Sequence, residues 1–141
     1  MTCPFCDGVA ERIVASNESA FAFPSLAPIV EGHILVCPRR HVKYYEELSD
    51  EEKKGIEELR LKIKGALKRV FKAEGFNYAW NEEMIGGQSV PHFHLHILPR
   101  KEGDAGVYGY EPRAFLYRPN ARSLSSEENL ATVISALRSV L

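Results

Sequence analysis

Short apolar and alternating runs in the first forty residues have the composition of β-strands. A turn at residues 16–18 follows the first run, and a loop at residues 24–32, with two prolines and a glycine, follows the second. Side chains alternate across a strand, so His33, Leu35 and Cys37 are expected on one face of the third. The pattern therefore predicts three strands, at residues 12–15, 19–23 and 33–37.

Two amphipathic helices are indicated by capping residues that precede apolar positions at helical spacing. Ser49 and Glu52 are the first and last residues of a capping box, in which the side chain of each accepts a hydrogen bond from the backbone N–H of the other. Gly75 marks the expected end of this helix. A second capping box, Ser125 to Glu128, opens a C-terminal helix. The apolar stripes are Ile56, Leu59, Ile63, Leu67 and Val70 in the first helix and Leu130, Val133, Ile134, Leu137 and Val140 in the second.

Two further strands complete the pattern. Residues 76–81 are rich in aromatic side chains, and residues 92–98 follow after a glycine pair at 86–87. Residues 101–123 hold glycines, prolines and four aromatic residues, which predicts a long functional loop. Strands joined mostly by short turns, with two helices beside them, predict a single α+β domain on an antiparallel sheet of about five strands.

Three of the five histidines stand within five residues, at His92, His94 and His96. Apolar residues alternate with them, so the three imidazoles share one face of a half-buried strand while Phe93 and Leu95 face a core. Neutral imidazoles spaced about 6.5–7 Å apart along a strand can hold a phosphate or metal ions. The alternative is an amphipathic strand with three histidines in solvent, which their concentration disfavours.

Composition then limits the class of protein. A chain of 141 residues with 45% hydrophobic and 26% charged residues has the make-up of one globular domain. A net charge of −1 gives no indication of nucleic-acid or membrane binding. No run of about 18 apolar residues or signal-peptide pattern is present. Three cysteines, an odd count, argue against a disulfide framework, and we expect a cytoplasmic protein.

The sequence His92-Phe-His-Leu-His-Ile-Leu98 resembles the signature of the histidine triad family of nucleotide hydrolases and transferases. The resemblance extends to Gly32-His-Ile-Leu-Val-Cys-Pro38 and Gly87-Gln-Ser-Val90, and so to most of residues 3–100. It implies a HIT-like fold. Leu98-Pro-Arg-Lys101 looks most like the diadenosine polyphosphate hydrolase branch, whereas Ser89 is similar to the nucleoside phosphoramidase branch.

The resemblance implies that His94 is a nucleophile, which attacks the α-phosphorus of a nucleotide and forms a nucleotidyl-histidine. Neutral imidazole is nucleophilic near pH 7 and leaves phosphorus readily, so one displacement becomes two easier ones. Its other ring nitrogen must then donate a hydrogen bond, which a backbone carbonyl can accept. His96 and His33 are expected to stabilise the phosphoryl charge. For His33 alone, an interior structural histidine is the alternative.

The resemblance also assigns polar and apolar contacts around the nucleotide. Gln88 and Ser89 are expected to position the phosphate and leaving group, and Asn81 to add a polar contact; loop and turn roles are the alternatives. Ser25 stands where relatives carry an aspartate or asparagine for the ribose, which weakens the implied ribose contact. The residues expected to line the nucleoside, or else only the core, are Phe5, Val9, Phe23, Pro24, Ser25 and Leu26.

Cys3-Pro-Phe-Cys6 has the usual spacing of two zinc thiolates, although a redox pair or two unused cysteines would have the same pattern. A redox role lacks a thioredoxin-like context. Zinc-containing members of the family, and the related hexose-phosphate uridylyltransferases, have two cysteines and two histidines in these places. The resemblance therefore implies a closed structural zinc site of Cys3, Cys6, His41 and His92.

We expect an enzyme that cleaves adenine nucleotides at the α-phosphate and releases AMP. Diadenosine polyphosphates are the first substrate class, with Arg100 and Lys101 either at the polyphosphate or simply solvated. Adenosine phosphoramidates and aminoacyl adenylates are the second. A nucleotidyl transferase would carry glutamine in place of His96, and a zinc-stabilised nucleotide-binding protein without catalysis would not need His94. Magnesium is a candidate companion of the substrate. Relatives form two-fold dimers, so a homodimer is expected, with residues 103–118 crossing to the neighbour or covering the site.

Overall fold

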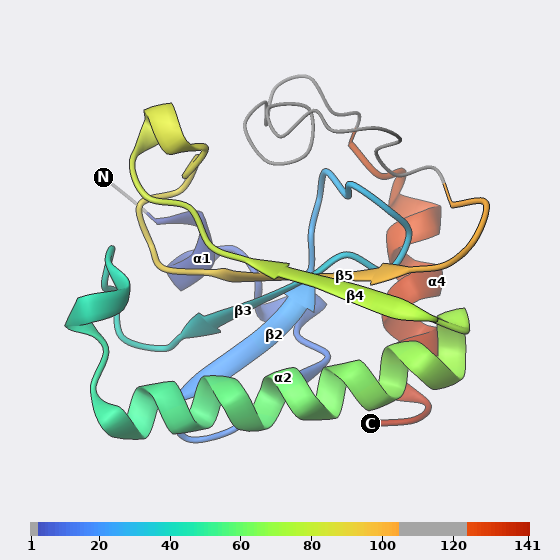
Figure 1. Cartoon of the computed structure of the whole chain (residues 1–141), viewed down its shortest axis with the longest axis horizontal. Coiled ribbons are helices and arrows are strands. Elements are labelled where there is room, and N and C mark those ends of the chain that lie inside the picture. Colours follow the sequence, from blue (N-terminus) through green and yellow to red (C-terminus); the bar gives the residue numbers. More distant parts are fainter. Residues whose placement is uncertain (1–2, 105–123) are drawn as a thin grey trace.

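A five-stranded antiparallel sheet forms the centre of the computed structural model, which describes residues 3–104 and 124–141 (Figure 1). The strand order β1-β2-β3-β5-β4 places β3 and β5 in the middle and β4 at one edge. This confirms the α+β fold and the number of strands. The strands are β1 (Ala15–Ser16), β2 (Ala20–Pro24), β3 (Ile34–Pro38), β4 (Gly75–Ala79) and β5 (Leu95–Arg100).

The long helix α2 (Asp50–Phe71) lies along one face of the sheet (Figure 1). The Ser49 hydroxyl accepts from the Glu52 N–H at 3.1 Å, and Glu52 accepts from the Ser49 N–H at 2.9 Å, so the predicted capping box is confirmed. The predicted apolar stripe of α2 packs on the apolar side chains that point to this face of the sheet. The packing removes both sets of side chains from water. The central members of this core are Ala22, Ile34, Val36, Leu59, Ile63, Leu67, Leu95 and Ile97.

The opposite face of the sheet carries a smaller apolar cluster and a single helical turn, α1 (Pro4–Asp7). The C-terminal helix α4 (Glu127–Arg138) packs on β2 and α2 through Leu137. Its cap is Ser126, whose hydroxyl accepts from Asn129 N–H at 3.0 Å, and not Ser125 as predicted. The Ser125 N–H instead donates to Leu26 O at 2.8 Å, which keeps this residue outside the helix.

Some predicted boundaries are wrong. Helix α2 ends at Phe71 and not at Gly75, which is the first residue of β4. A strand was predicted at residues 12–15, but Arg12 belongs to a 3₁₀ turn, η1 (Ala10–Arg12). The Arg12 N–H closes this turn by donating to Val9 O at 2.8 Å. Strand β1 is only two residues long. The ladder of β4 ends at Ala79, before the predicted residue 81, and β5 begins at Leu95 rather than at the first histidine. The remaining short turns are η2 (Tyr45–Glu47) and η3 (Met84–Gly86).

Most of the loop expected at residues 101–123 lies outside the described residues, as does most of segment 103–118. None of the described helices combines the length and apolar character that a bilayer-spanning helix requires.

Candidate active site with an adjoining cysteine–histidine cluster

Three buried histidines gather on the face of the sheet opposite α2. The β3–β5 register places His96 directly across from Leu35, so His33 and His94 share its face of the sheet. The rings of His94 and His96 lie 4.9 Å apart, and those of His33 and His96 lie 5.1 Å apart. The residues between them, Phe93, Leu95 and Ile97, belong to the core under α2, as the alternation predicts.

A chain of hydrogen bonds fixes the proton positions of His33 and His96. The Ile29 N–H donates to His33 Nδ1 at 3.1 Å, so the proton of the neutral His33 ring is on Nε2. That Nε2 lies 2.9 Å from His96 Nδ1, which therefore accepts. Neutral His96 must in turn carry its proton on Nε2. The arrangement makes His96 Nε2 a hydrogen-bond donor on the histidine face.

His94 has the opposite tautomer. Its Nδ1 lies 2.8 Å from the carbonyl oxygen of His92, which can only accept, so the His94 proton is on Nδ1. The lone pair of the neutral ring is then on Nε2, the nitrogen away from the backbone. A ring nitrogen with a lone pair and, on the neighbouring ring, an N–H donor are the two groups that nucleophilic attack at phosphorus requires.

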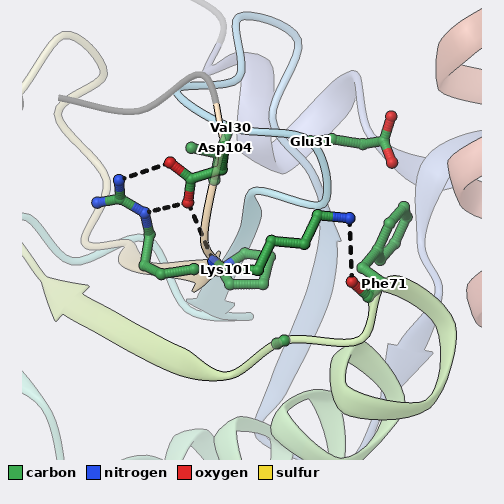
Figure 2. A pocket seen from close by; sticks show the side chains of 8 residues that line it. Val30, Glu31, Phe71, Lys101 and Asp104 are labelled. Atoms are coloured by element: carbon green, nitrogen blue, oxygen red, sulfur yellow. Dashed lines mark hydrogen bonds and ion pairs between the residues drawn. The ribbon is translucent and has the colours of Figure 1, made fainter. Parts of the chain in front are cut away.

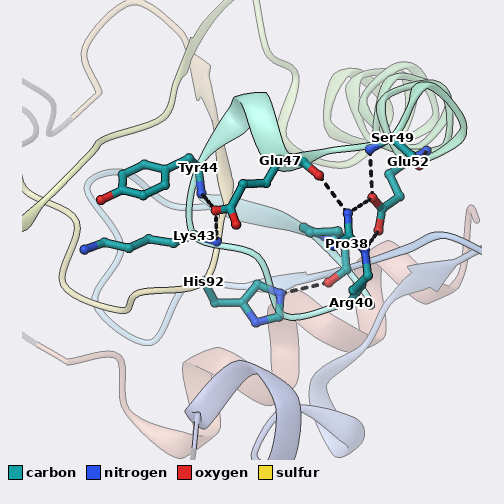
Figure 3. Close-up of polar contacts among 8 residues, drawn as sticks. All are labelled: Pro38, Arg40, Lys43, Tyr44, Glu47, Ser49, Glu52 and His92. Carbon is teal, nitrogen blue, oxygen red and sulfur yellow. Dashed lines mark hydrogen bonds and ion pairs between the residues drawn. The ribbon is translucent and has the colours of Figure 1, made fainter.

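His92 points to a different set of partners. Its Nε2 lies 2.8 Å from Pro38 O and therefore donates (Figure 3). The lone pair of the neutral ring is then on Nδ1, the nitrogen nearest the two thiols. The Nδ1 atom is 3.5 Å from Cys3 Sγ and 3.6 Å from Cys6 Sγ, and His41 Nδ1 is 3.5 Å from Cys6 Sγ. Burial lowers the pKa of His92, which keeps this ring neutral.

These four side chains fit a tetrahedral divalent ion. All four ligand atoms of Cys3, Cys6, His41 and His92 lie within 4.8 Å of one another. Bonds of about 2.3 Å for Zn–S and 2.0 Å for Zn–N separate sulfur and nitrogen by about 3.5 Å around a tetrahedral ion. The three sulfur–nitrogen distances of 3.5, 3.5 and 3.6 Å agree with that value. The His92 bond to Pro38 O is the outer contact that metal-bound histidines commonly make.

The surroundings of Cys6 disfavour its thiolate. Burial, with the neighbouring Cys3 thiol and Asp7 adding to the effect, raises the pKa of Cys6 to about 11. A bound divalent ion reverses this, because its charge stabilises the deprotonated sulfur. Cys37, by contrast, is fully buried in the apolar cluster with Phe21 and Leu35, and serves there as a small hydrophobic residue.

A model of the HIT domain family matches residues 8–103 of this chain. The chain belongs to the HIT domain family. It is 39% identical over 132 residues to an uncharacterized HIT-like protein of Mycoplasma genitalium, a match that covers 91% of this chain and 89% of that protein. A bis(5'-adenosyl)-triphosphatase of Dictyostelium discoideum is 35% identical over 93 residues, covering 66% of this chain and 62% of the relative.

Among solved structures, a zinc-bound histidine triad family protein of Mycobacterium smegmatis superposes with a TM-score of 0.72 and 26% identity, covering 99% of this chain and 95% of that one. The matched HIT range of 8–103 contains the three alternating histidines and His33 but not Cys3 or Cys6. The cysteine–histidine cluster therefore adds residues beyond the family match.

The loop before the histidines of this HIT domain is held by Gln88. Its Nε2 donates to Lys43 O at 3.0 Å, and its Oε1 accepts from the Glu83 N–H at 3.3 Å. Gln88 is buried, so its amide anchors the loop, whereas Ser89 beside it is exposed. Asn81 is buried at the start of the same loop. A phosphate or leaving-group role for these three residues stays a prediction.

The residues expected around a nucleoside fall into two groups. Phe5, Val9 and Phe23 pack together in the apolar cluster opposite α2, and Phe23 has no exposed surface. Pro24 and Ser25, together with His33, line a cavity of about 260 Å³ between the 24–33 loop and α4. The Ser25 hydroxyl accepts from Ala27 N–H at 3.3 Å. Leu26 is 46% exposed.

Arg100 and Lys101, the residues considered for a polyphosphate, have protein partners. Arg100 makes two bonds to the Asp104 carboxylate, at 2.8 and 2.9 Å, and one to Asn77 at 2.9 Å. Figure 2 shows the Lys101 amine reaching the Phe71 carbonyl. The two atoms are 3.3 Å apart, and both residues line a cavity of about 180 Å³. These contacts support a structural role at the end of β5.

Sequence reasoning did not identify Ile29 and Pro38, which determine two of the histidine tautomers. Both act through backbone atoms, which every residue possesses, so no side-chain pattern in the sequence could have indicated them.

Proposed function

We propose that this HIT protein is a nucleotide hydrolase that acts at the α-phosphorus through a nucleotidyl intermediate on His94. The observation that carries the proposal is the pair of opposite tautomers: the lone pair is on Nε2 of His94, and the proton is on Nε2 of His96. A purely structural pair of histidines would not require this arrangement, whereas attack at phosphorus does.

The proposed reaction has two displacements. His94 Nε2 attacks the α-phosphorus, a P–N bond forms, and the bond from phosphorus to the leaving group breaks. Water then attacks the same phosphorus, the P–N bond breaks, and the nucleoside monophosphate leaves with His94 restored. His92 O holds the proton on His94 Nδ1 throughout, and His96, supported by His33, donates to the charged phosphoryl oxygens.

Diadenosine polyphosphates are the substrate class that we propose first, with AMP as one product. The Dictyostelium relative named bis(5'-adenosyl)-triphosphatase and the sequence Leu98-Pro-Arg-Lys101 support this class. Adenosine phosphoramidates and aminoacyl adenylates are the alternative, and the exposed hydroxyl of Ser89 next to the catalytic strand favours them. His96 argues against a nucleotidyl transferase, and His94 argues against a nucleotide-binding protein without catalysis.

We also propose that the cluster of Cys3, Cys6, His41 and His92 binds zinc. The sulfur–nitrogen distances and the zinc-bound relative of Mycobacterium smegmatis support this metal. Zinc there would tie the N-terminal segment to the start of the catalytic strand. Within residues 3–104 and 124–141, the four side chains of this cluster are the ones whose ligand atoms all lie within 4.8 Å of one another, and magnesium as a companion of the substrate stays a prediction.

A homodimer and a cytoplasmic location remain predictions. The exposed edge of β4 supports the dimer, because an edge strand offers unpaired backbone groups to another chain. Tyr78 and Trp80 lie beside this edge with 36% and 44% of their surfaces exposed, and Trp80 stacks on Tyr45 at 4.8 Å. Light scattering of the purified protein measures the oligomeric state directly.

The proposed function is tested by measuring AMP release from diadenosine triphosphate and from adenosine phosphoramidate, with wild type and His94→Ala. We expect turnover of at least one substrate by wild type and none by the variant, and the faster substrate identifies the class. Wild type that binds AMP but cleaves neither substrate would contradict the hydrolase proposal.

A further inference from the structure

Phe5 lies between Cys3 and Cys6 in the sequence, and its ring packs against the proposed nucleophile, His94. Its ring meets the His94 ring edge-on, with centroids 5.0 Å apart and planes at 84°. It makes similar contacts with Phe23 at 5.1 Å and with His92 at 6.0 Å. Only 9% of Phe5 is exposed. Its surface is thus mostly covered by protein side chains, which leaves little of it for a nucleobase.

Two of the contacts that position His94 come from the cluster or from the turn that carries its cysteines. The first is the hydrogen bond from Nδ1 to the backbone oxygen of His92, itself one of the four ligand residues. The second is the edge contact with Phe5, which lies between Cys3 and Cys6 in the sequence. Aromatic edge contacts have a preferred geometry, so they orient a ring as well as bury it.

The turn that carries Phe5 is too short to hold itself in place. Helix α1 has four residues, and no side chain caps its N-terminus. A single helical turn is unstable alone, because nucleation fixes several backbone angles for one hydrogen bond. The packing of Phe5 in the apolar cluster helps to hold α1 in place, and a metal bound by Cys3, Cys6 and the two histidines would add a cross-link.

We propose that Phe5 is a positioning residue through which a thiolate-bound divalent ion at the cluster orients the His94 ring. This inference depends on the proposed role of His94. With the ion bound, α1 is fixed, the Phe5 edge is held against His94, and the ring keeps the orientation that directs Nε2 at phosphorus. The metal site then affects the rate of the chemical step as well as the stability of the fold.

The test compares Phe5→Leu with a matched control, Phe21→Leu. Phe21 belongs to the same apolar cluster and stacks on Phe23 at 5.7 Å. Both variants remove a ring of equal size from this cluster, but Phe5 is the one with the ring contact to His94. Cobalt absorption spectra report metal binding, steady-state kinetics separate kcat from KM, and proton NMR of the His94 Nδ1–H, assigned by its absence in His94→Ala, reports ring orientation.

We expect Phe5→Leu to bind cobalt with an unchanged spectrum, to lose at least tenfold in kcat with little change in KM, and to show a shifted or broadened His94 N–H signal. Removing the metal from wild type with a chelator should change that signal in the same way, and Phe21→Leu should match wild type. An unchanged kcat and signal in Phe5→Leu, or a rise in KM alone, would overturn the proposal. If wild type cleaves no nucleotide, the hydrolase proposal fails, but the NMR comparison still shows whether Phe5 and the metal orient the His94 ring. A failure of the proposed function can therefore be told apart from a failure of this inference.

Discussion

Two glycines of α2 offer a matched pair of substitutions with different expected effects on stability. A Cβ added at Gly65 meets no heavy atom within 4 Å. Because alanine is favoured over glycine in a helix interior by about 1 kcal/mol, Gly65→Ala should raise the free energy of unfolding by about that amount. A Cβ added at Gly55 would lie 2.8 Å from Ser19 Cβ and 3.2 Å from Asn17 Oδ1.

The turn that faces Gly55 has little freedom to move. Asn17 Oδ1 accepts from the N–H groups of Ser19 and Ala20 at 3.0 and 2.8 Å, and its Nδ2 donates to Gly55 O at 3.0 Å. Overpacking of this kind costs about 1–3 kcal/mol, which equals or exceeds the gain in helix propensity. Gly55→Ala is therefore expected to leave stability unchanged or to lower it by up to about 2 kcal/mol.

Thermal unfolding followed by circular dichroism measures both variants. At about 3 °C per kcal/mol for a chain of this size, Gly65→Ala should melt about 3 °C above wild type, and Gly55→Ala at or below wild type. Adding Ser19→Gly to Gly55→Ala removes the nearest atom and should recover part of the loss. Equal stabilisation by the two alanines would refute the close approach of α2 to the turn before β2.

Three further substitutions have defined outcomes. Hydrogen bonding to Arg40 lowers the pKa of Glu52, so the pair stabilises the fold at neutral pH and its contribution is lost as pH falls through the folded-state pKa (Figure 3). In urea unfolding, Glu52→Gln should be less stable than wild type by about 0.5–1 kcal/mol at pH 7, and this difference should disappear at acid pH. A difference that stays constant with pH would show that the Glu52 charge does not contribute. Lys72 ends α2 with φ 57°, so Lys72→Gly should stabilise by about 0.5–1 kcal/mol in the same assay, and a loss would show that its side-chain contacts dominate. His33→Phe removes the donor to His96 and should lower kcat about 100-fold, and an unchanged kcat would contradict the tautomer argument.

Alternation was sufficient to predict the histidine face, because side-chain direction in a strand follows directly from sequence position. The carbonyl partner expected for the ring of His94 is present, as His92 O. The cluster of Cys3, Cys6, His41 and His92 also came together from three separate segments, as the resemblance implied. Whether these residues have their proposed roles is a matter for the experiments above.

Other features depend on tertiary contacts that no local pattern contains. Arg12 lies in a 3₁₀ turn rather than a strand, and its guanidinium donates to Pro24 O at 3.0 Å. Ser125 has the sequence of a cap, but the Leu26 carbonyl binds its N–H. The contact of the Phe5 ring with His94 and the hydrogen bond from the Gln88 amide to Lys43 O also join segments far apart in the sequence.

The central claim, covalent catalysis by His94, is tested most directly by trapping the intermediate. Wild-type protein is mixed with diadenosine triphosphate and quenched in alkali, in which phosphoramidates survive, and the peptide with the three alternating histidines is fragmented by mass spectrometry. We predict one adenylyl group on His94 at early times and none in His94→Ala. Adenylation of another residue, or turnover that persists in His94→Ala, would contradict the account.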